Sequence, residues 1–423
     1  MTEKKKAILI GVNKKNSEDD FEYLMEELKG LVIACDMKVV GELAQNLDHI
    51  NKAHYIGSGK IDELKGLVEF TEADVVVAND ELSPSQIRVL EDELDIRVID
   101  RTMLILDIFA QRAKTREAKL QVDLARLQYL LPRLIGQKDY DQQGGREDLH
   151  NRGAGETKLE LDRRKIEEKI SSLKKELENL GSQRETQRSK RKNSGLPLVS
   201  LVGYTNAGKS TIMNAMVEMF SSSQDKQVFE QDMLFATLET SVRKIELPDN
   251  KSFLLTDTVG FINKLPHNLV KAFRSTLEEL ANAELLIHVI DYSEANHEKL
   301  MEVTDETLRE IGVNDIPVIQ AFNKTDLTDD ELPMVVNNRV YLSARKKIGI
   351  TELLQLISDK IFKDYVECEM LIPYEQGQIL SYFHENAHVL KSDYEEEGTR
   401  IIVECKESDY EKYQDYSVSK IKC

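Results

Sequence analysis

The hydrophobic and polar positions of the first hundred residues alternate between short apolar runs and amphipathic stretches. Residues 6–12 (KAILIGV), 31–43, 73–80 and 96–100 are predicted strands, and residues 18–31, 60–70 and 83–94 are predicted helices. Strands alternating with helices are typical of a largely parallel sheet. We therefore expect an α/β domain over residues 1–112. The glycines and lysine at 57–60 lack the spacing of a phosphate-binding loop and are predicted to form a strand-to-helix turn.

The pattern changes to a long helical period over residues 113–193. Leucines recur every three or four residues before position 135, and a heptad of Leu and Ile follows after position 158. These positions are Leu120, Leu124, Leu127, Leu131 and Leu134, then Leu159, Ile166, Ile170, Leu173, Leu177 and Leu180. We expect an antiparallel helical hairpin with the glycine-rich stretch 142–156 as its tip loop. A solvated linker helix is the alternative, and Pro132 is expected to end or kink the first helix.

Two further regions follow a linker rich in Ser, Gly and Pro. Residues 196–363 again alternate strands and helices, whereas residues 366–423 are acidic and contain one predicted strand, RIIVEC at 400–405. The fold class expected is therefore multidomain α/β: an N-terminal α/β domain with a helical hairpin, a second α/β domain, and a small α+β C-terminal domain.

Composition and charge limit the partners of the chain. Its 423 residues are 41% hydrophobic and 31% charged, with a net charge of −19, so binding to nucleic acid would need a local basic patch. Residues 158–192 provide one, with twelve Lys or Arg against seven Asp or Glu. The four cysteines form no CxxC motif, and no apolar run is long enough for a signal or a membrane span. We expect a cytoplasmic protein without membrane insertion and without a stable homo-oligomer.

The first chemical motif is LVSLVGYTNAGKST, a buried-type strand followed by a glycine-rich loop and a helix. Backbone N–H groups of such a loop wrap phosphates, while Lys209 reaches the β and γ phosphates and the Ser210 hydroxyl binds Mg²⁺. The predicted phosphate-binding residues are Gly203, Asn206, Ala207, Gly208, Lys209, Ser210 and Thr211.

Three later motifs, in a fixed order, select GTP. In DTVG, Asp257 can hold the magnesium shell, and the N–H of Gly260 can sense the γ-phosphate. In NKTD the Asp326 carboxylate can accept two hydrogen bonds that guanine donates and adenine does not. Asn323 and Lys324 belong to the same motif, and Ser343, Ala344 and Arg345 can meet the guanine O6. Together the motifs predict a P-loop GTPase that uses GTP and Mg²⁺.

The switch threonine should lie between the phosphate loop and Asp257. Thr237, in the segment LFATL, is the favoured third magnesium ligand beside Ser210 and Asp257, and Thr240 is the second choice. The predicted catalytic residues are Lys209, Thr237 and Gly260. Phe261 stands where many GTPases carry a glutamine that orients water, so intrinsic hydrolysis should be slow and stimulated by a partner.

The segment HENAH, residues 384–388, matches the H-E-x-x-H signature of zinc proteases. It lies in a stretch that is predicted to be an amphipathic helix of the acidic domain. The pattern is short and common by chance, and the metalloprotease interpretation is disfavoured.

The motifs VSLVGYTNAGKST, LFATL, DTVGFINKLPHNLV and NKTD, preceded by RGAGETKLELDRR, resemble those of the HflX family of ribosome-associated GTPases. The resemblance extends to about residue 362. It implies a GTPase domain of the TRAFAC Obg–HflX type, binding to the large (50S) ribosomal subunit and its 23S rRNA near the catalytic centre, and splitting of stalled or idle 70S ribosomes. It also implies hydrolysis stimulated by the ribosome, with a hydrophobic residue after DxxG.

The tip loop departs from the family pattern. The family usually has two glycines, a short neutral linker and Arg-Gly-Pro-Gly-Glu, whereas this chain has a charged insert, REDLHN, and Ala154 in place of the proline. A longer tip could disturb a drug site, so a resistance-type variant is one hypothesis. The alternative function is a GTP-gated RNA-binding factor for large-subunit assembly. The candidate rRNA-contacting residues are Gly144, Gly145, Arg146, His150, Asn151, Arg152, Gly153 and Gly155.

Overall fold

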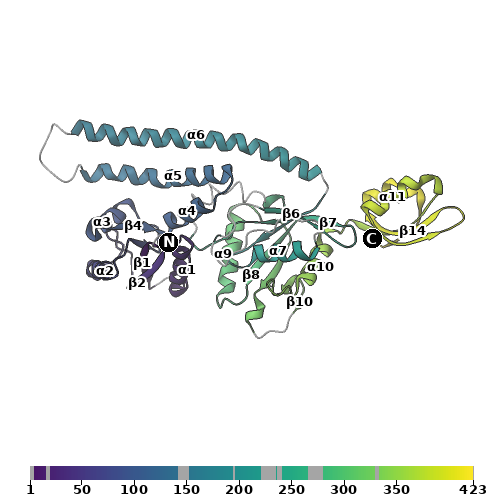
Figure 1. Ribbon diagram of the computed structural model, residues 1–423, viewed down its shortest axis with the longest axis horizontal. Helices are drawn as coiled ribbons and strands as arrows, with labels where there is room; N and C mark the ends of the chain where they lie inside the picture. The colour runs from purple at the N-terminus through teal and green to yellow at the C-terminus, as the bar shows by residue number, and fades with distance from the viewer. Residues whose placement is uncertain are drawn as a thin grey trace. The chain divides into compact units, whose positions relative to one another are not determined.

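The computed structural model describes residues 4–15, 20–141, 152–193, 196–220, 235, 241–264, 280–328 and 333–422 (Figure 1). For residues 134–141, 152–160, 182–193 and 421–422 only the backbone is described. The chain forms two compact units. The first comprises Met1–Ser189, Gln231–Glu239 and Val259–Leu277, and the second comprises Lys190–Glu230, Thr240–Thr258 and Glu278–Cys423. Within the described residues no helix is long and apolar enough to cross a membrane.

The N-terminal part of the first unit is a four-stranded parallel sheet with helical connections. Its elements are β1 (Lys6–Lys14), α1 (Phe21–Ala34), β2 (Lys38–Leu47), α2 (Ser58–Thr71), β3 (Val75–Ala78), α3 (Pro84–Leu94), β4 (Arg97–Asp100) and α4 (Arg101–Arg112). The strand order is β2-β1-β3-β4, and every neighbouring pair is parallel. The predicted α/β fold is confirmed. The residues predicted to form a strand-to-helix turn are the first turn of α2, which begins at Ser58, whereas β2 ends at Leu47.

One predicted strand was partly wrong. Residues 31–34 complete helix α1, and β2 begins only at Lys38. Leu24, Leu28 and Leu31 are buried on one helix face, so the apolar end of the run extends that face. A short apolar run is compatible with a strand and with a buried helix segment, and hydrophobic periodicity alone cannot distinguish them.

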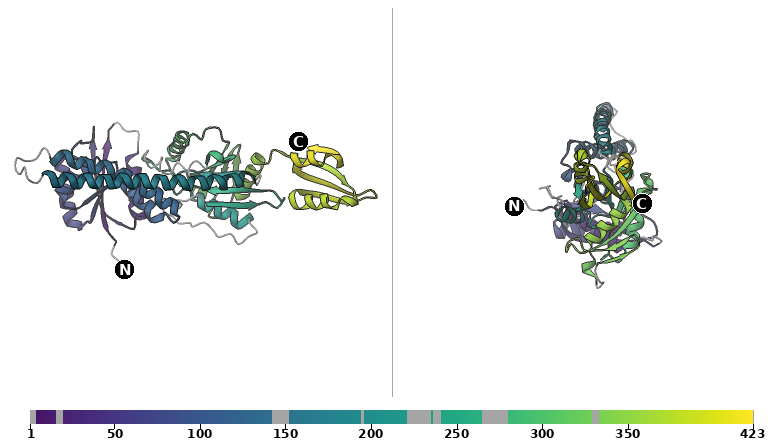
Figure 2. Two further views of the ribbon diagram at one scale, coloured as in Figure 1. Left: turned by 90° about the horizontal axis from the view of Figure 1, so that it is seen from above. Right: turned by 90° about the vertical axis from the view of Figure 1, so that its right-hand side faces the viewer.

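The hairpin consists of α5 (Arg116–Asp141) and α6 (Arg152–Asn193), which run side by side (Figures 1 and 2). Leu124, Ile170 and Leu173 form its buried centre, and further leucines of both predicted seams pack around them. Arg116 Nε donates to Glu176 Oε1 at 2.9 Å across the pair. The helical hairpin predicted from the leucine spacing is therefore confirmed.

The structure corrects the bounds predicted for the tip loop and shows no helix end at Pro132. Helix α5 does not end at Pro132 but continues to Asp141, and Arg133 Nη1 donates to Tyr129 O at 2.8 Å within the turn that the proline disturbs. Helix α6 begins at Arg152, so residues 152–156 are helical and not part of the loop.

The α/β domain of the second unit has a seven-stranded sheet. Its elements are β5 (Leu198–Val202), α7 (Lys209–Phe220), β6 (Ser241–Glu246), β7 (Ser252–Asp257), η1 (Leu280–Asn282), β8 (Leu285–Asp291), α9 (His297–Glu310), β9 (Val318–Asn323), η2 (Thr325–Leu327), β10 (Met334–Val336), β11 (Arg339–Tyr341) and α10 (Ile350–Ile361). The order is β10-β11-β9-β8-β5-β7-β6, with the outer pair at each edge antiparallel. The carboxyl ends of β5, β7, β8, β9 and β11 therefore share one edge of the sheet.

The C-terminal region is a four-stranded antiparallel sheet with helices. Its elements are β12 (Tyr365–Ile372), η3 (Tyr374–Gln376), α11 (Gly377–Asn386), β13 (His388–Tyr394), β14 (Thr399–Lys406), α12 (Glu407–Lys412), η4 (Gln414–Tyr416) and β15 (Ser417–Lys422). The α+β class is confirmed, but the sequence predicted only the strand that became β14. In β12 buried and half-buried positions alternate, but glutamates occupy half-buried positions, so the sequence did not indicate a strand there.

Candidate nucleotide-binding site

The phosphate loop connects the end of β5 to the first turn of α7, as the sequence predicted. Lys209 is the first residue of α7, so the free N–H groups of the helix N-terminus face the loop. Gly203 and Gly208 have φ angles of 143° and 94°. A Cβ on Gly203 would lie 2.2 Å from Val289 O, and one on Gly208 would lie 2.2 Å from Asn323 Nδ2. Only glycine fits at either position.

Lys209 is buried at the centre of this loop. Its Nζ donates to Gly203 O at 3.0 Å and to Tyr204 O at 2.7 Å. Burial lowers the pKa of Lys209 to about 8, against the opposing influence of the Asp257 carboxylate. The neighbouring His288 on β8 is also buried, and burial together with Lys209 lowers its pKa to about 4. His288 is therefore neutral at pH 7, whereas Lys209 is the cation that the phosphate loop encloses.

Ser210 and Asp257 meet beside this lysine. Ser210 Oγ donates to Asp257 Oδ2 at 2.6 Å, which places a hydroxyl and a carboxylate oxygen side by side. A hydroxyl and a carboxylate oxygen are the hard donors that Mg²⁺ prefers, so this pair fits the ion that the fold implies. A magnesium ion held there would neutralise phosphate charge during transfer of the γ-phosphoryl group.

Asn323, at the end of β9, connects three loops of the site. Its Nδ2 donates to Ala207 O at 2.9 Å, and its Oδ1 accepts from Ala344 N at 3.0 Å. The side chain is buried, and both of its neighbours belong to predicted nucleotide-binding motifs. The structure thus brings the phosphate loop, the NKTD motif and residues 343–345 together, although Ala207 precedes Asn323 by 116 residues and Ala344 follows it by 21.

Two residues at the guanine-recognition motif, Thr325 and Asp291, were not among the predicted site residues. Lys324 has a left-handed φ of 63°, and its Nζ lies 2.7 Å from Asp291 Oδ2. Thr325 Oγ1 donates to Leu342 O at 2.7 Å and fixes the strand ends against each other. Asp291 ends the apolar strand β8 as Asp257 ends β7, a signal that could have identified it. Asp326 is largely buried, with Lys346 Nζ 3.7 Å away.

The remaining predicted residues are distributed as follows. Asn206 and Arg345 are exposed, and Thr211 lies in the first turn of α7. Phe261 is 1% exposed, so its ring is removed from solvent. Thr237, Thr240, Gly144, Gly145, Arg146, His150 and Asn151 lie outside the described residues. Arg152, Gly153 and Gly155 lie in the first turns of α6.

Three family models match consecutive parts of the chain. Residues 22–110 match the GTP-binding GTPase N-terminal family, residues 112–191 match the GTP-binding GTPase middle region, and residues 198–324 match the 50S ribosome-binding GTPase family. The GTPase HflX of Caldanaerobacter subterraneus subsp. tengcongensis is 43% identical over 403 residues, covering 95% of this chain and 91% of that protein. This chain belongs to the HflX family of GTPases. It therefore binds GTP and hydrolyses it.

Other relatives also match over most of their length. The GTPase HflX of Escherichia coli is 39% identical over 382 residues, covering 89% of this chain and 88% of that protein. Among solved structures, a GTP-binding protein from Sulfolobus solfataricus in complex with GDP is 26% identical, covers 85% of this chain and 98% of its own, and has a TM-score of 0.43. The match to the HflX GTPases thus includes the hairpin and the N-terminal domain as well as the motifs.

The HENAH segment of this HflX-family chain does not form a zinc-protease helix. Helix α11 ends at Asn386, and His388 belongs to strand β13, so the two histidines do not share a helix face. His388 lies near Asp249 and Glu404 instead. Lys251 Nζ lies 3.3 Å from Asp249 Oδ2 and 2.8 Å from Glu404 Oε2, so both carboxylates already pair with this ammonium.

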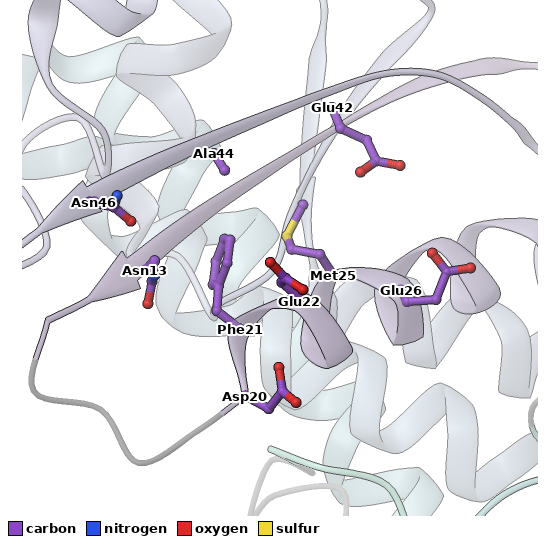
Figure 3. A pocket seen from close by; sticks show the side chains of 9 residues that line it. All are labelled: Asn13, Asp20, Phe21, Glu22, Met25, Glu26, Glu42, Ala44 and Asn46. Carbon is purple, nitrogen blue, oxygen red and sulfur yellow. The ribbon is translucent and has the colours of Figure 1, made fainter. Parts of the chain in front are cut away.

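The N-terminal sheet carries a cavity of about 720 Å³ between the ends of β1 and β2 and the first turns of α1 (Figure 3). Four carboxylates line it, from Asp20, Glu22, Glu26 and Glu42. Carboxylates repel phosphates, so this cavity does not suit a second nucleotide.

Proposed function

We propose that this GTPase binds the 50S ribosomal subunit through its hairpin arm and splits or rescues stalled or idle 70S ribosomes in its GTP-bound state. The observation that supports the proposal most is the combination of a GTPase site with a long helical arm in one chain. Helix α6 has 42 residues, which corresponds to about 63 Å at the usual rise per residue. An arm of this length can reach into a large particle.

The charge of α6 supports contact with 23S rRNA. Arg164, Lys165, Lys169, Lys174 and Lys175 are exposed on the described part of the helix. The chain as a whole carries a net charge of −19, so phosphate backbones would attract this arm and repel most of the remaining surface. In this proposal residues 144–155 contact the rRNA, and the protein works in the cytoplasm.

The buried Phe261 ring supports stimulation by the ribosome. Phenylalanine cannot hydrogen-bond a water molecule, and its side chain is 1% exposed. The group that orients the attacking water must then come from another residue or from the bound particle. Hydrolysis should therefore be slow in the isolated protein and faster with 50S subunits.

A density gradient tests the proposal. Purified 70S ribosomes are mixed with the full chain and GTP, GDP or a non-hydrolysable GTP analogue. We expect free subunits with GTP and the analogue, and intact 70S with GDP. A Lys209→Ala variant should leave the 70S intact. Intact 70S under all conditions would refute splitting, and protein that comigrates only with free 50S would favour the assembly-factor alternative.

We further propose that the charged insert 146–151 gives protection against drugs that bind the large subunit. The insert lengthens the tip relative to the family pattern, and drugs near the catalytic centre would lie within its reach. Deleting residues 146–151 should abolish protection of translation from such a drug and spare GTP hydrolysis. Equal protection by the deletion variant and the parent protein would contradict this proposal.

A further inference from the structure

Two segments next to the nucleotide motifs belong to the first unit and not to the unit that contains the phosphate loop. They are Gln231–Glu239 and Val259–Leu277, of which the structure describes Phe235 and residues 259–264. The boundary between the units falls after Thr258, inside the DTVG motif. Residues that follow Gly260 are in fact held by side chains of the N-terminal domain.

Arg101 provides the first of these contacts. It is the first residue of α4 and is 2% exposed. Its Nη1 donates to Asn79 Oδ1 at 3.2 Å, and its Nη2 donates to the buried carboxylate of Glu27 and, at 3.2 Å, to Asn263 O. A buried guanidinium is tolerated only when it is paired and hydrogen-bonded. These acceptors fix its orientation and hold the backbone three residues after Gly260.

The neighbouring residues are held as well. Lys264 Nζ donates to Asp80 Oδ1 at 2.9 Å, and Asp80 Oδ2 accepts from Tyr55 OH at 2.7 Å. Phe261 and Ile262 are 1% and 2% exposed. Each of the four residues that follow Gly260 is thus buried or hydrogen-bonded.

Helix α4 also contacts the other segment. The Phe235 ring, which is buried, packs edge-on against Phe109 with the ring centroids 4.7 Å apart. Phe235 lies two residues before Thr237, the predicted switch threonine. Arg101 and Phe109 are separated by about two helical turns. One helix of the N-terminal domain therefore holds described residues of both segments.

We propose that Arg101 is a positioning residue for GTP hydrolysis, acting through the backbone of Asn263 on Gly260. A backbone N–H such as that of Gly260 stabilises a transition state best when it is already held in place. If the segment around it is mobile, ordering it on GTP binding costs conformational entropy. GDP has no γ-phosphate for Gly260 to meet, and Lys209, Ser210, Asp257 and Asn323 belong to the other unit. Replacing Arg101 should therefore lower the affinity for GTP and the rate of GTP hydrolysis but leave the affinity for GDP unchanged. The proposal rests on the GTPase activity of the family and not on ribosome binding.

Two variants of the full chain test it. Arg101→Lys keeps a cation opposite Glu27. The single lysine nitrogen cannot donate to all three acceptors, on Asn79, Glu27 and Asn263, that the two guanidinium nitrogens of arginine reach. Lys264→Gln removes the ion pair with Asp80. Because the Lys264 side chain is 35% exposed, we expect this variant to fold like the parent. The affinities for GDP and for a non-hydrolysable GTP analogue and the single-turnover rate of GTP hydrolysis are measured without ribosomes. For both variants we expect the analogue affinity and the rate to fall at least about fivefold, with GDP affinity unchanged within about twofold.

The matched control is Lys6→Gln. It removes an ion pair of the same unit, Lys6 with Glu72 at 3.2 Å, at a lysine that is 31% exposed and that also donates to Thr71 O at 3.2 Å. We expect its three measurements to equal those of the parent. The proposal is overturned if both variants keep the parent analogue affinity and rate, if the rate rises, or if GDP affinity falls as much as analogue affinity.

Discussion

Replacing Asn323 with alanine gives the sharpest test of how the nucleotide site is assembled. The change removes the hydrogen bond from Nδ2 to Ala207 O (2.9 Å) and the bond from Ala344 N to Oδ1 (3.0 Å). The Asn323 side chain is 3% exposed, and its two partners are buried as well. Water therefore replaces neither bond unless the loops separate.

The structure sets the size of the effect. Losing one hydrogen bond, and leaving its buried partner without water, costs about 1–2 kcal/mol of free energy. The two bonds together therefore cost about 2–4 kcal/mol. Without nucleotide the phosphate loop and residues 343–345 can move apart and recover water, so the cost is felt when the nucleotide draws them together. Affinity for GDP and GTP should then fall by about 30-fold to 1000-fold.

Equilibrium titration with a fluorescent guanine nucleotide measures this change. The control is Asn250→Gly, because Asn250 Nδ2 also makes two bonds, to His384 O at 3.2 Å and Ala387 O at 3.1 Å. Asn250 has a φ of 62°, which glycine tolerates. The control should bind like the parent. If Asn323→Ala also binds within about threefold of the parent, the two bonds do not hold the site together and the reasoning fails.

Three further predictions concern single residues of the site. Since burial lowers the pKa of Lys209 to about 8 and bound phosphates raise it, the free protein loses a proton above pH 8 that the complex retains. GDP affinity measured by calorimetry should fall by up to about tenfold per pH unit above pH 8, and a flat profile would contradict this. Asp326→Asn should lower GTP affinity by about 100-fold or more and favour xanthine nucleotides in competition titrations, because an amide can donate to the xanthine O2; unchanged base preference would exclude Asp326 from guanine recognition. Phe261→Gln should not raise the single-turnover rate but should lower the melting temperature, since it places a polar group at a site that is 1% exposed; a faster enzyme with unchanged melting would contradict this.

The sequence predicted those features in which chemistry or packing restricts the residue type. Gly203 and Gly208 must be glycines because a Cβ would overlap backbone or side-chain atoms, and this demand produces a recognisable spacing. The leucine seams of the hairpin were likewise predictable, because Leu124, Ile170 and Leu173 must face one another.

The sequence failed where a residue acts through tertiary contacts. Nothing near Arg101 indicates that its guanidinium reaches Asn263, which lies 162 residues later in the chain. Asp291 resembles any acid at a strand end until Lys324 is seen 2.7 Å away. Strands β12 and β13 of the C-terminal sheet were missed for another reason: their outward positions carry charged residues, which hide the alternation.

The hairpin arm and the proposed positioning residue are joined by one dipeptide. Asp100 is fully buried and accepts hydrogen bonds from Tyr129 OH and, at 3.3 Å, from Arg133 Nη2, both on α5 of the arm. The next residue, Arg101, donates to Asn263 O. A force applied to the arm by a bound particle would therefore act on α5, on Asp100 and then, through one peptide bond, on the segment that follows Gly260. If the two proposals hold together, ribosome-stimulated hydrolysis should depend on Arg133 in the same way that intrinsic hydrolysis depends on Arg101.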